Sequence, residues 1–218
     1  MERRVSLFCG HYGSGKTNVA LNWAYALRTR HPRVAVADLD IVNPYFRAKD
    51  SLRLLEERDI RLICSPYAGG NLDIPALPQD MYAITDDPDL YAVVDVGGDD
   101  RGALVLGRLA PGLLAERNYD MWLVINRHRP LTRTVEECLE VRAEIEAAGG
   151  MPFTGIVNNS NLGRETTPQH VLASVDYARE VARQTGLPLV MTSVRADLVP
   201  ALTGVVDNLF ALTLQETY

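Results

Sequence analysis

The chain has 218 residues, 47% of them hydrophobic, and a formal net charge of −6 at pH 7. This length and hydrophobic content predict a single α/β domain, residues 1–218, with a sizeable core. The acidic balance argues against a general nucleic-acid-binding or anionic-membrane surface, although a local basic patch is compatible with it.

The cysteines and the N-terminus give an expectation of compartment. Cys9, Cys64 and Cys138 are widely spaced and form no C-x-x-C pair, as expected of free thiols in a reducing compartment rather than of a metal or Fe–S site. Residues 1–4 lead directly into a predicted strand, and no apolar run reaches transmembrane length. We therefore expect a cytoplasmic protein without a signal peptide.

Short β-branched runs alternate with helical patterns along the chain, which is typical of βαβ units around a parallel sheet. Strands are expected at Val5–Cys9, Val34–Asp38, Ile60–Cys64, Ala92–Val96, Met121–Ile125, Thr154–Asn158 and Leu187–Thr192. Helices are expected in the gaps, notably at Thr17–Thr29, Gly102–Glu116, Leu131–Ala148, Pro168–Thr185 and Pro200–Leu212. The Pro- and Gly-rich segment Ser65–Pro78 is expected to be a long surface loop. The predicted fold is a three-layer α/β domain with a mostly parallel sheet of about seven strands and helices on both faces.

The segment after the first predicted strand, Gly10–Thr17, matches the G-x-x-x-x-G-K-[ST] phosphate-binding loop residue for residue. Its glycines permit the backbone angles with which consecutive N–H groups cradle phosphate oxygens, and the next helix adds its positive N-terminal end. Lys16 is expected to reach the β- and γ-phosphates, and the Thr17 hydroxyl to coordinate Mg²⁺. A glycine-rich turn that matches by chance is the alternative, but the strand before and the helix after are the context that the motif requires.

Acidic residues follow two further strands, where ligands of a parallel sheet gather. Asp38 is suited to hold a Mg²⁺-bound water and Asp40 to orient the attacking water, whereas a helix-capping or turn pair is the alternative for a lone D-x-D. Asp95 ends an apolar run in the manner of a Walker B strand, whose acid meets Mg²⁺ through water. Gly97 and Gly98 then let the backbone approach the γ-phosphate, a position suited to a nucleotide-sensing switch.

The loop, Asp38-x-Asp40 and Asp95-x-Gly97-Gly98 together resemble the MinD/ParA/ArsA group of P-loop ATPases, of the SIMIBI class, over most of the chain. Residues 38–47 in particular resemble a set of small uncharacterised MinD-like ATP-binding proteins. The resemblance implies the cofactors ATP and Mg²⁺, catalysis by Lys16 and Asp40, and metal contacts from Thr17, Asp38 and Asp95. The nucleotide contacts it implies are Gly10, His11, Tyr12, Gly13, Ser14, Gly15, Lys16, Thr17, Asn18, Gly98, Asn126, Asn158, Asn159 and Ser193.

Two loop positions depart from the family pattern. The family places a second lysine directly after its first glycine, where it reaches the partner's nucleotide across a sandwich dimer, and here that position is His11. A neutral imidazole carries no charge and donates one hydrogen bond, so an ATP-dependent homodimer is expected to be weakened. An ordinary solvent-facing histidine, or one that contacts a partner, is the alternative. Tyr12 replaces a family glycine and restricts the backbone.

Other family properties can be compared with this sequence. Membrane-targeting members end in a basic amphipathic helix, whereas residues 209–218 contain no lysine or arginine, so no membrane partner is expected. The N/T-K-x-D motif with which GTPases of the class read guanine is missing, which favours ATP over GTP. The run Asn126–Arg133 contains three arginines that are suited to a phosphate, an acidic partner or DNA, or that belong to a solvated loop before a helix.

Two functions from different classes remain. The first is an ATP-binding, slowly hydrolysing, Mg²⁺-dependent switch ATPase that regulates a partner protein. The alternative is an ATP-dependent small-molecule kinase or ligase of the dethiobiotin synthetase-like type. The switch is favoured because the sequence has two nucleotide-sensing loops, whereas no further cluster of residues defines an organic substrate pocket. A nucleic-acid partner is not expected.

Overall fold

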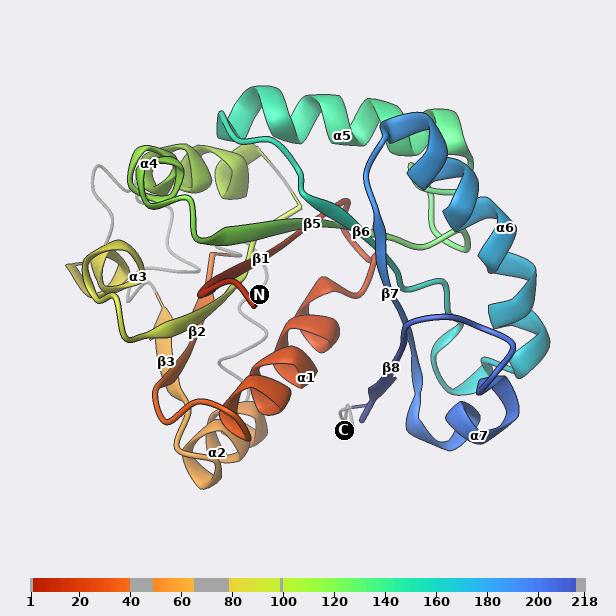
Figure 1. Ribbon diagram of the computed structural model, residues 1–218, viewed down its shortest axis with the longest axis horizontal. Helices are drawn as coiled ribbons and strands as arrows, with labels where there is room; N and C mark the ends of the chain where they lie inside the picture. Colours follow the sequence, from red (N-terminus) through yellow and green to blue (C-terminus); the bar gives the residue numbers. More distant parts are fainter. Residues whose placement is uncertain (1, 40–48, 65–78, 99, 215–218) are drawn as a thin grey trace.

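The computed structural model describes residues 2–39, 49–64, 79–98 and 100–214. Its strands form one parallel sheet in the order β3-β2-β4-β1-β5-β6-β7-β8 (Figure 1). The strands are β1 (Val5–Cys9), β2 (Val34–Asp38), β3 (Arg61–Cys64), β4 (Tyr91–Asp95), β5 (Tyr119–Ile125), β6 (Gly155–Asn158), β7 (Leu189–Arg195) and β8 (Leu209–Leu212). The helices are α1 (Lys16–Arg28), α2 (Lys49–Glu57), α3 (Ala83–Asp86), α4 (Asp100–Glu116), α5 (Val135–Gly149), α6 (Pro168–Thr185) and α7 (Val199–Leu202). Short 3₁₀ turns lie at η2 (Gln79–Tyr82), η3 (Gly163–Glu165) and η4 (Ala196–Leu198).

Helices cover both faces of the sheet. Figure 1 shows α1 and α2 on one face and α3, α4 and α5 on the other, with α6 continuing that second layer past β6. Each face has its own apolar core, one packed under α1 and α2 and the other under α3, α4, α5 and α6. A third cluster joins α6, β7 and α7. Because both faces are covered, the central strands are apolar at nearly every position.

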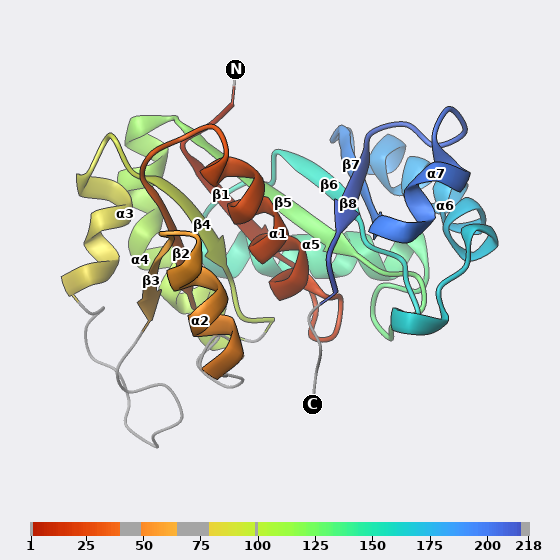
Figure 2. The same ribbon diagram turned by 90° about the horizontal axis from the view of Figure 1, so that it is seen from below.

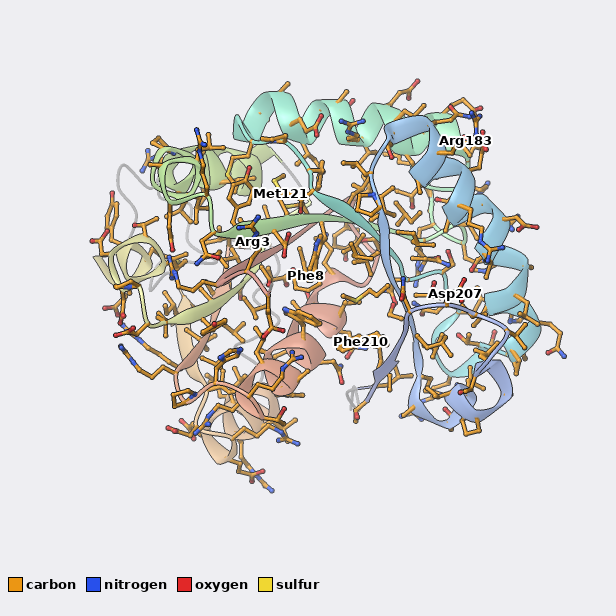
Figure 3. All side chains as sticks on the ribbon, in the orientation of Figure 1. Arg3, Phe8, Met121, Arg183, Asp207 and Phe210 are labelled. Atoms are coloured by element: carbon orange, nitrogen blue, oxygen red, sulfur yellow. The ribbon has the colours of Figure 1, made fainter. Side chains whose placement is uncertain are left out.

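Strand β1 shows how a buried strand supplies both cores. Alternate residues point to opposite faces, so Val5, Leu7 and Cys9 join the core under α4 and α5 while Phe8 packs toward α1. The Phe8 ring meets Trp122 edge to face with centroids 5.2 Å apart. Figure 3 shows Phe8 on the α1 side of the sheet and Met121 on the other.

The expected fold class is confirmed, with eight strands in place of about seven. The seven predicted strands all form, and β1 and β2 have the predicted bounds. The other five shift by up to three residues at an end, and α1, α4 and α6 match or nearly match their predicted ranges.

The helix predicted at Pro200–Leu212 is wrong. Only Val199–Leu202 is helical, and Leu209–Leu212 is the parallel edge strand β8, whose Phe210 pairs in register with Ser193 of β7. Gly204 with φ +79° and Asn208 with φ +52° occupy the left-handed region, which ends a helix. The chain therefore turns between them and returns to the sheet.

Helix α5 begins at Val135, four residues after the predicted start at Leu131. Thr134 forms a capping box in which its hydroxyl accepts from the Glu137 N–H while the Glu137 carboxylate accepts from the Thr134 N–H. Leu131 has φ +62°, which a helical residue does not adopt. Residues 126–134 are consequently a loop that follows β5 at the edge of the sheet.

The fold gathers several loops at one end of the molecule. Parallel strands all point the same way, and Figure 2 shows the turns that follow β1, β4, β5 and β6 at the same end. Strand β1 lies between β4 and β5. The strands β2 and β3 lie on the β4 side of β1, whereas β6, β7 and β8 lie on the β5 side, so the order of the strands reverses at β1. Ligands of such sheets bind at this switch point, outside the carboxyl ends of the strands. No helix among the described residues has the length and apolar character needed to span a bilayer.

Candidate nucleotide-binding site

The loop between β1 and α1 contains three glycines in a backbone conformation that other residues rarely adopt. Gly10, Gly13 and Gly15 have φ values of +148°, +78° and +85°. A Cβ on Gly10 would stand 2.5 Å from the Val124 carbonyl oxygen, closer than packing allows. Gly15 occupies the N-cap position of α1, so the helix begins at Lys16 with its free N–H groups facing the loop.

Lys16 lies within this loop rather than in solvent. Its side chain is 6% exposed, and its Nζ donates to the His11 carbonyl oxygen at 3.2 Å. The ammonium is therefore held over the loop backbone, where a phosphate of the motif's ligand would lie. Burial raises the pKa of the nearby Cys9 thiol, so this thiol stays neutral and adds no negative charge beside the loop.

Thr17 and Asp95 are joined directly, although they are far apart in the sequence. The Thr17 hydroxyl donates to Asp95 Oδ2 at 2.5 Å, and Asp95 is 1% exposed. Asp38 is also buried, and it pairs in register with Asp95 across β2 and β4, so both carboxylates point to the same face of the sheet. The Leu39 N–H donates to the Asp95 carbonyl at 2.9 Å and fixes this register. The Thr17 hydroxyl and the carboxylates that end β2 and β4 are oxygen donors of the kind that Mg²⁺ prefers.

The turn after β4 rests on the phosphate loop. A Cβ on Gly98 would lie 2.6 Å from the Tyr12 nitrogen and 3.0 Å from the Gly10 carbonyl oxygen. Only a residue without a side chain allows this approach. The backbones of the β4–α4 turn and the loop are thus in contact. A conformational change in one of them would therefore displace the other.

Asn159, which follows β6, supports the loop from the other side. Its Nδ2 donates to the Ser14 carbonyl at 2.7 Å, and its Oδ1 accepts from the Ser193 hydroxyl at 2.7 Å. Its own N–H donates to the Ile125 carbonyl at the end of β5. Ser14, Asn159 and Ser193 are buried, and these hydrogen bonds link β5, β6 and β7 to the loop.

The amides of Asn126 and Asn158 hold the turns that follow β5 and β6. Asn158 Nδ2 donates to the Ser174 hydroxyl at 2.9 Å, and its Oδ1 accepts from the Ser160 N–H. Asn126 Oδ1 accepts from the His128 N–H at 3.0 Å, which shapes the loop after β5. Contacts of these two residues with a nucleotide stay predictions, as does that of Ser193.

The remaining loop residues differ in exposure. His11 Nδ1 lies 3.0 Å from the Tyr12 carbonyl oxygen, and the Tyr12 ring is 65% exposed. Ser14 Oγ is buried and has no hydrogen-bond partner among the described residues, so it is a polar atom that a bound ligand or water would satisfy. Asn18 accepts from Asn22 through its carbonyl oxygen and its Oδ1.

Some predicted residues lie outside the described part of the chain. These are Asp40, the rest of the 40–48 segment and the 65–78 segment. The roles assigned to Asp40 and to the Ser65–Pro78 loop stay predictions.

Sequence reasoning missed two features that the structure brings to the site. Asn22 exchanges hydrogen bonds with the backbone of Thr213, which ties α1 to the segment after β8. Arg129 lies beside Gly13 of the phosphate loop. The run of arginines after β5 is visible in the sequence, but nothing there distinguishes Arg129 from its neighbours.

Comparison with solved structures shows the fold. The chain is similar to the signal recognition particle receptor FtsY from Elizabethkingia anophelis in complex with GDP, with a TM-score of 0.53, 14% identity, and coverage of 89% of this chain and 58% of that one. For chloroplast FtsY from Physcomitrella patens the TM-score is 0.56 and the identity 14%, with coverage of 88% of this chain and 58% of that one. For the cell division protein FtsY from Thermotoga maritima the TM-score is 0.55 and the identity 18%, with coverage of 87% of this chain and 61% of that one. The chain thus spans about three fifths of the length of these proteins. No protein-family model and no curated protein sequence matches it. The fold is that of a P-loop nucleoside triphosphatase domain.

Proposed function

We propose that the chain binds ATP with Mg²⁺ and hydrolyses it slowly, as a switch of the SIMIBI class that regulates a partner protein. The observation that carries the proposal is the hydrogen bond from Thr17 to Asp95 at the foot of the glycine loop. This bond joins a hydroxyl and a carboxylate, which suit Mg²⁺, beside a loop whose N–H groups and Lys16 suit phosphates. The match of the loop to the P-loop motif and the similarity to FtsY both support this proposal.

Each residue in the site has a separate task under this proposal. Bound Mg²⁺ would neutralise part of the charge on the phosphates. Asp95 orients the Thr17 hydroxyl, and Asp38 supplies a second carboxylate on the same face. Lys16 places a positive charge over the loop, and Asn159 holds the Ser14 peptide in position. Asp40 is proposed to orient the attacking water.

The contact between the β4–α4 turn and the loop supports the switch function. Gly98 touches the loop backbone, and α4 begins at Asp100, two residues later. A nucleotide that alters the loop would therefore displace the start of a 17-residue helix on the surface of the molecule. We propose that this helix end forms part of the surface that a partner protein recognises.

The small-molecule kinase remains the alternative, but one cavity that the structure describes does not serve it. A cavity of about 450 Å³ is lined by Pro32, Arg33, Arg61 and Leu90, near the starts of β2, β3 and β4. In a parallel sheet this is the end opposite the glycine loop. A substrate bound there would be too far from the phosphates to accept one.

The choice of base needs a direct measurement. The FtsY structure from Elizabethkingia anophelis contains GDP, whereas this sequence has only two lysines and lacks the guanine-reading N/T-K-x-D motif. We therefore expect tighter binding of ATP than of GTP, measured by isothermal titration with Mg²⁺. Tighter binding of GTP would overturn the choice of ATP and leave the switch proposal standing.

The decisive experiment replaces Lys16. We expect Lys16→Ala to abolish tight ATP·Mg²⁺ binding while the melting temperature without nucleotide changes little, because the Nζ bonds only to a loop carbonyl. Arg28→Ala is the matched control, since it removes one positive charge from the opposite end of the same helix. Equal ATP affinity in wild type and Lys16→Ala would refute the phosphate-loop assignment.

A further inference from the structure

Arg129 lies next to the phosphate loop. A Cβ built on Gly13 would stand 3.9 Å from Arg129 Cδ, so the aliphatic stem of this arginine lies beside the loop. Gly13 belongs to the loop that follows β1, and Arg129 belongs to the loop that follows the adjacent strand β5. The two loops meet because β1 and β5 are neighbours in the sheet.

The backbone that carries Arg129 is fixed in place. Its N–H donates to the Asn126 carbonyl oxygen at 3.0 Å, and the buried Thr132 hydroxyl donates to the same oxygen at 2.9 Å. The Asn126 amide closes the turn through the His128 N–H. The stem of Arg129 therefore starts from a defined position, although its end is exposed.

The charge of Arg129 is not neutralised by a carboxylate. Among the side chains that the structure describes, which leave out Asp50, Asp99 and Asp100, no Asp or Glu lies within ion-pair distance of Arg129. The neighbouring Arg127, by contrast, is engaged, since it donates to the Ala173 carbonyl and lies over the Tyr177 ring. Desolvation, followed by the charges of Arg127, His170 and Arg129, lowers the pKa of His128. Arg129 is therefore an exposed positive charge without a carboxylate partner among the described side chains.

We propose that Arg129 binds the phosphate chain of the nucleotide within the same subunit, as a second cation beside Lys16. This inference rests on the proposed function. Nucleotide phosphates carry several negative charges, of which one metal ion and one lysine neutralise only a part. A guanidinium presents several N–H groups in a planar fork that matches phosphate oxygens. Its long stem lets it close onto a ligand while the backbone stays fixed.

The test compares three variants by isothermal titration with ATP and ADP in the presence of Mg²⁺. Arg129→Gln is expected to weaken ATP binding by about tenfold or more, as loss of a hydrogen bond to a charged group does. Arg129→Lys keeps the charge and is expected to retain most of the affinity. Arg133→Gln is the matched control, because it removes an exposed arginine from the same loop without a contact to the glycine loop.

The dependence of ATP affinity on salt concentration provides a second readout. A merely structural role of Arg129 would leave this dependence unchanged. Because Arg129 is exposed, its attraction to phosphate is screened, so ATP affinity should fall less steeply with added salt in Arg129→Gln than in wild type. Equal melting temperatures without nucleotide would show that the fold is intact.

The outcomes separate this inference from the function on which it rests. If wild type binds ATP and Lys16→Ala does not, but Arg129→Gln binds as tightly as Arg133→Gln, the inference is overturned and the proposed function survives. If wild type binds neither ATP nor GTP, the proposed function itself fails.

Discussion

Asn159 shows how a residue's task depends on partners that are distant in the sequence. The resemblance to MinD-like ATPases predicts that it contacts the nucleotide, which stays a prediction, and the structure shows its amide donating to the Ser14 carbonyl. These two residues are 145 positions apart, and Ser193 completes the link from β7. The phosphate loop is thus held at its Ser14 peptide by a side chain from another strand.

Asn159→Ala tests this support. The change removes the donor to the Ser14 carbonyl and leaves buried polar atoms without partners, so the free energy of unfolding should fall by about 1–3 kcal/mol. ATP affinity should fall as well, because the loop loses a fixed point. Ser193→Ala is the graded comparison, and it should have the smaller effect since Asn161 also donates to Asn159 Oδ1. Unchanged denaturation midpoints and unchanged affinity in Asn159→Ala would contradict the role.

The candidate site was predictable where its chemistry is local. The segment Gly10–Thr17 carries its backbone requirements in its own sequence, and the apolar run before Asp95 marks the end of a buried strand. The links of Asn159 to Ser14 and of Arg129 to Gly13 depend on which strands are neighbours. A single sequence does not specify strand order, so these contacts could not be foreseen.

Elements were predictable from the same kind of local signal. Strand β1 is a continuous apolar run bounded by Gly10, and α6 starts at Pro168 behind the Thr167 capping residue, as sequence patterns predict. The error at Pro200–Leu212 has a local cause, because the apolar residues of β8 suit a helix and a strand equally well. Pairing of β8 with β7 decides between them.

Gly98→Ala tests the coupling between the β4–α4 turn and the phosphate loop. The added methyl would stand 2.6 Å from the Tyr12 nitrogen, which belongs to backbone and cannot rotate away. We expect the two elements to separate, the free energy of unfolding to fall by about 1–3 kcal/mol, and ATP hydrolysis and binding both to weaken.

Gly107→Ala is the control for this change. It lies in α4, and its added Cβ would be 3.6 Å from the Ala148 carbonyl, an ordinary contact. Alanine is the better helix former, so this variant should be as stable as wild type or more so, by up to about 1 kcal/mol. Thermal melts and hydrolysis rates of the two variants decide the question. Equal rates for Gly98→Ala and wild type would rule out a coupled turn.

At the scale of the whole molecule, the sheet order sets where the site lies. Strand β1 is flanked by β4, which carries Asp95, and by β5, which is followed by Arg129. The glycine loop therefore lies between an acidic strand end, suited to a metal ion, and a basic loop, suited to phosphates. This division places the negative and positive groups on opposite sides of Gly10–Thr17.

The last prediction concerns association of two copies, where His11 stands in place of the lysine of related ATPases. The Nδ1 of His11 lies against the Tyr12 carbonyl oxygen, and Tyr12 is largely exposed at the tip of the loop. Two triphosphates that face each other across a dimer repel strongly unless cations lie between them. If Arg129 serves its own subunit's phosphates, this arginine is not available to the partner's phosphates. We therefore expect the wild-type protein to stay largely monomeric with a non-hydrolysable ATP analogue and Mg²⁺, and His11→Lys to dimerise under the same conditions.

Light scattering of both proteins, with and without the analogue, measures this directly. His11→Gln is the control, because it changes the side chain without adding the charge that dimerisation is expected to need. A wild-type protein that already dimerises tightly on the analogue would show that another cation crosses the interface. Arg129→Gln would then identify it: if this variant binds the analogue as a monomer, the arginine acts on the partner's phosphates rather than on its own.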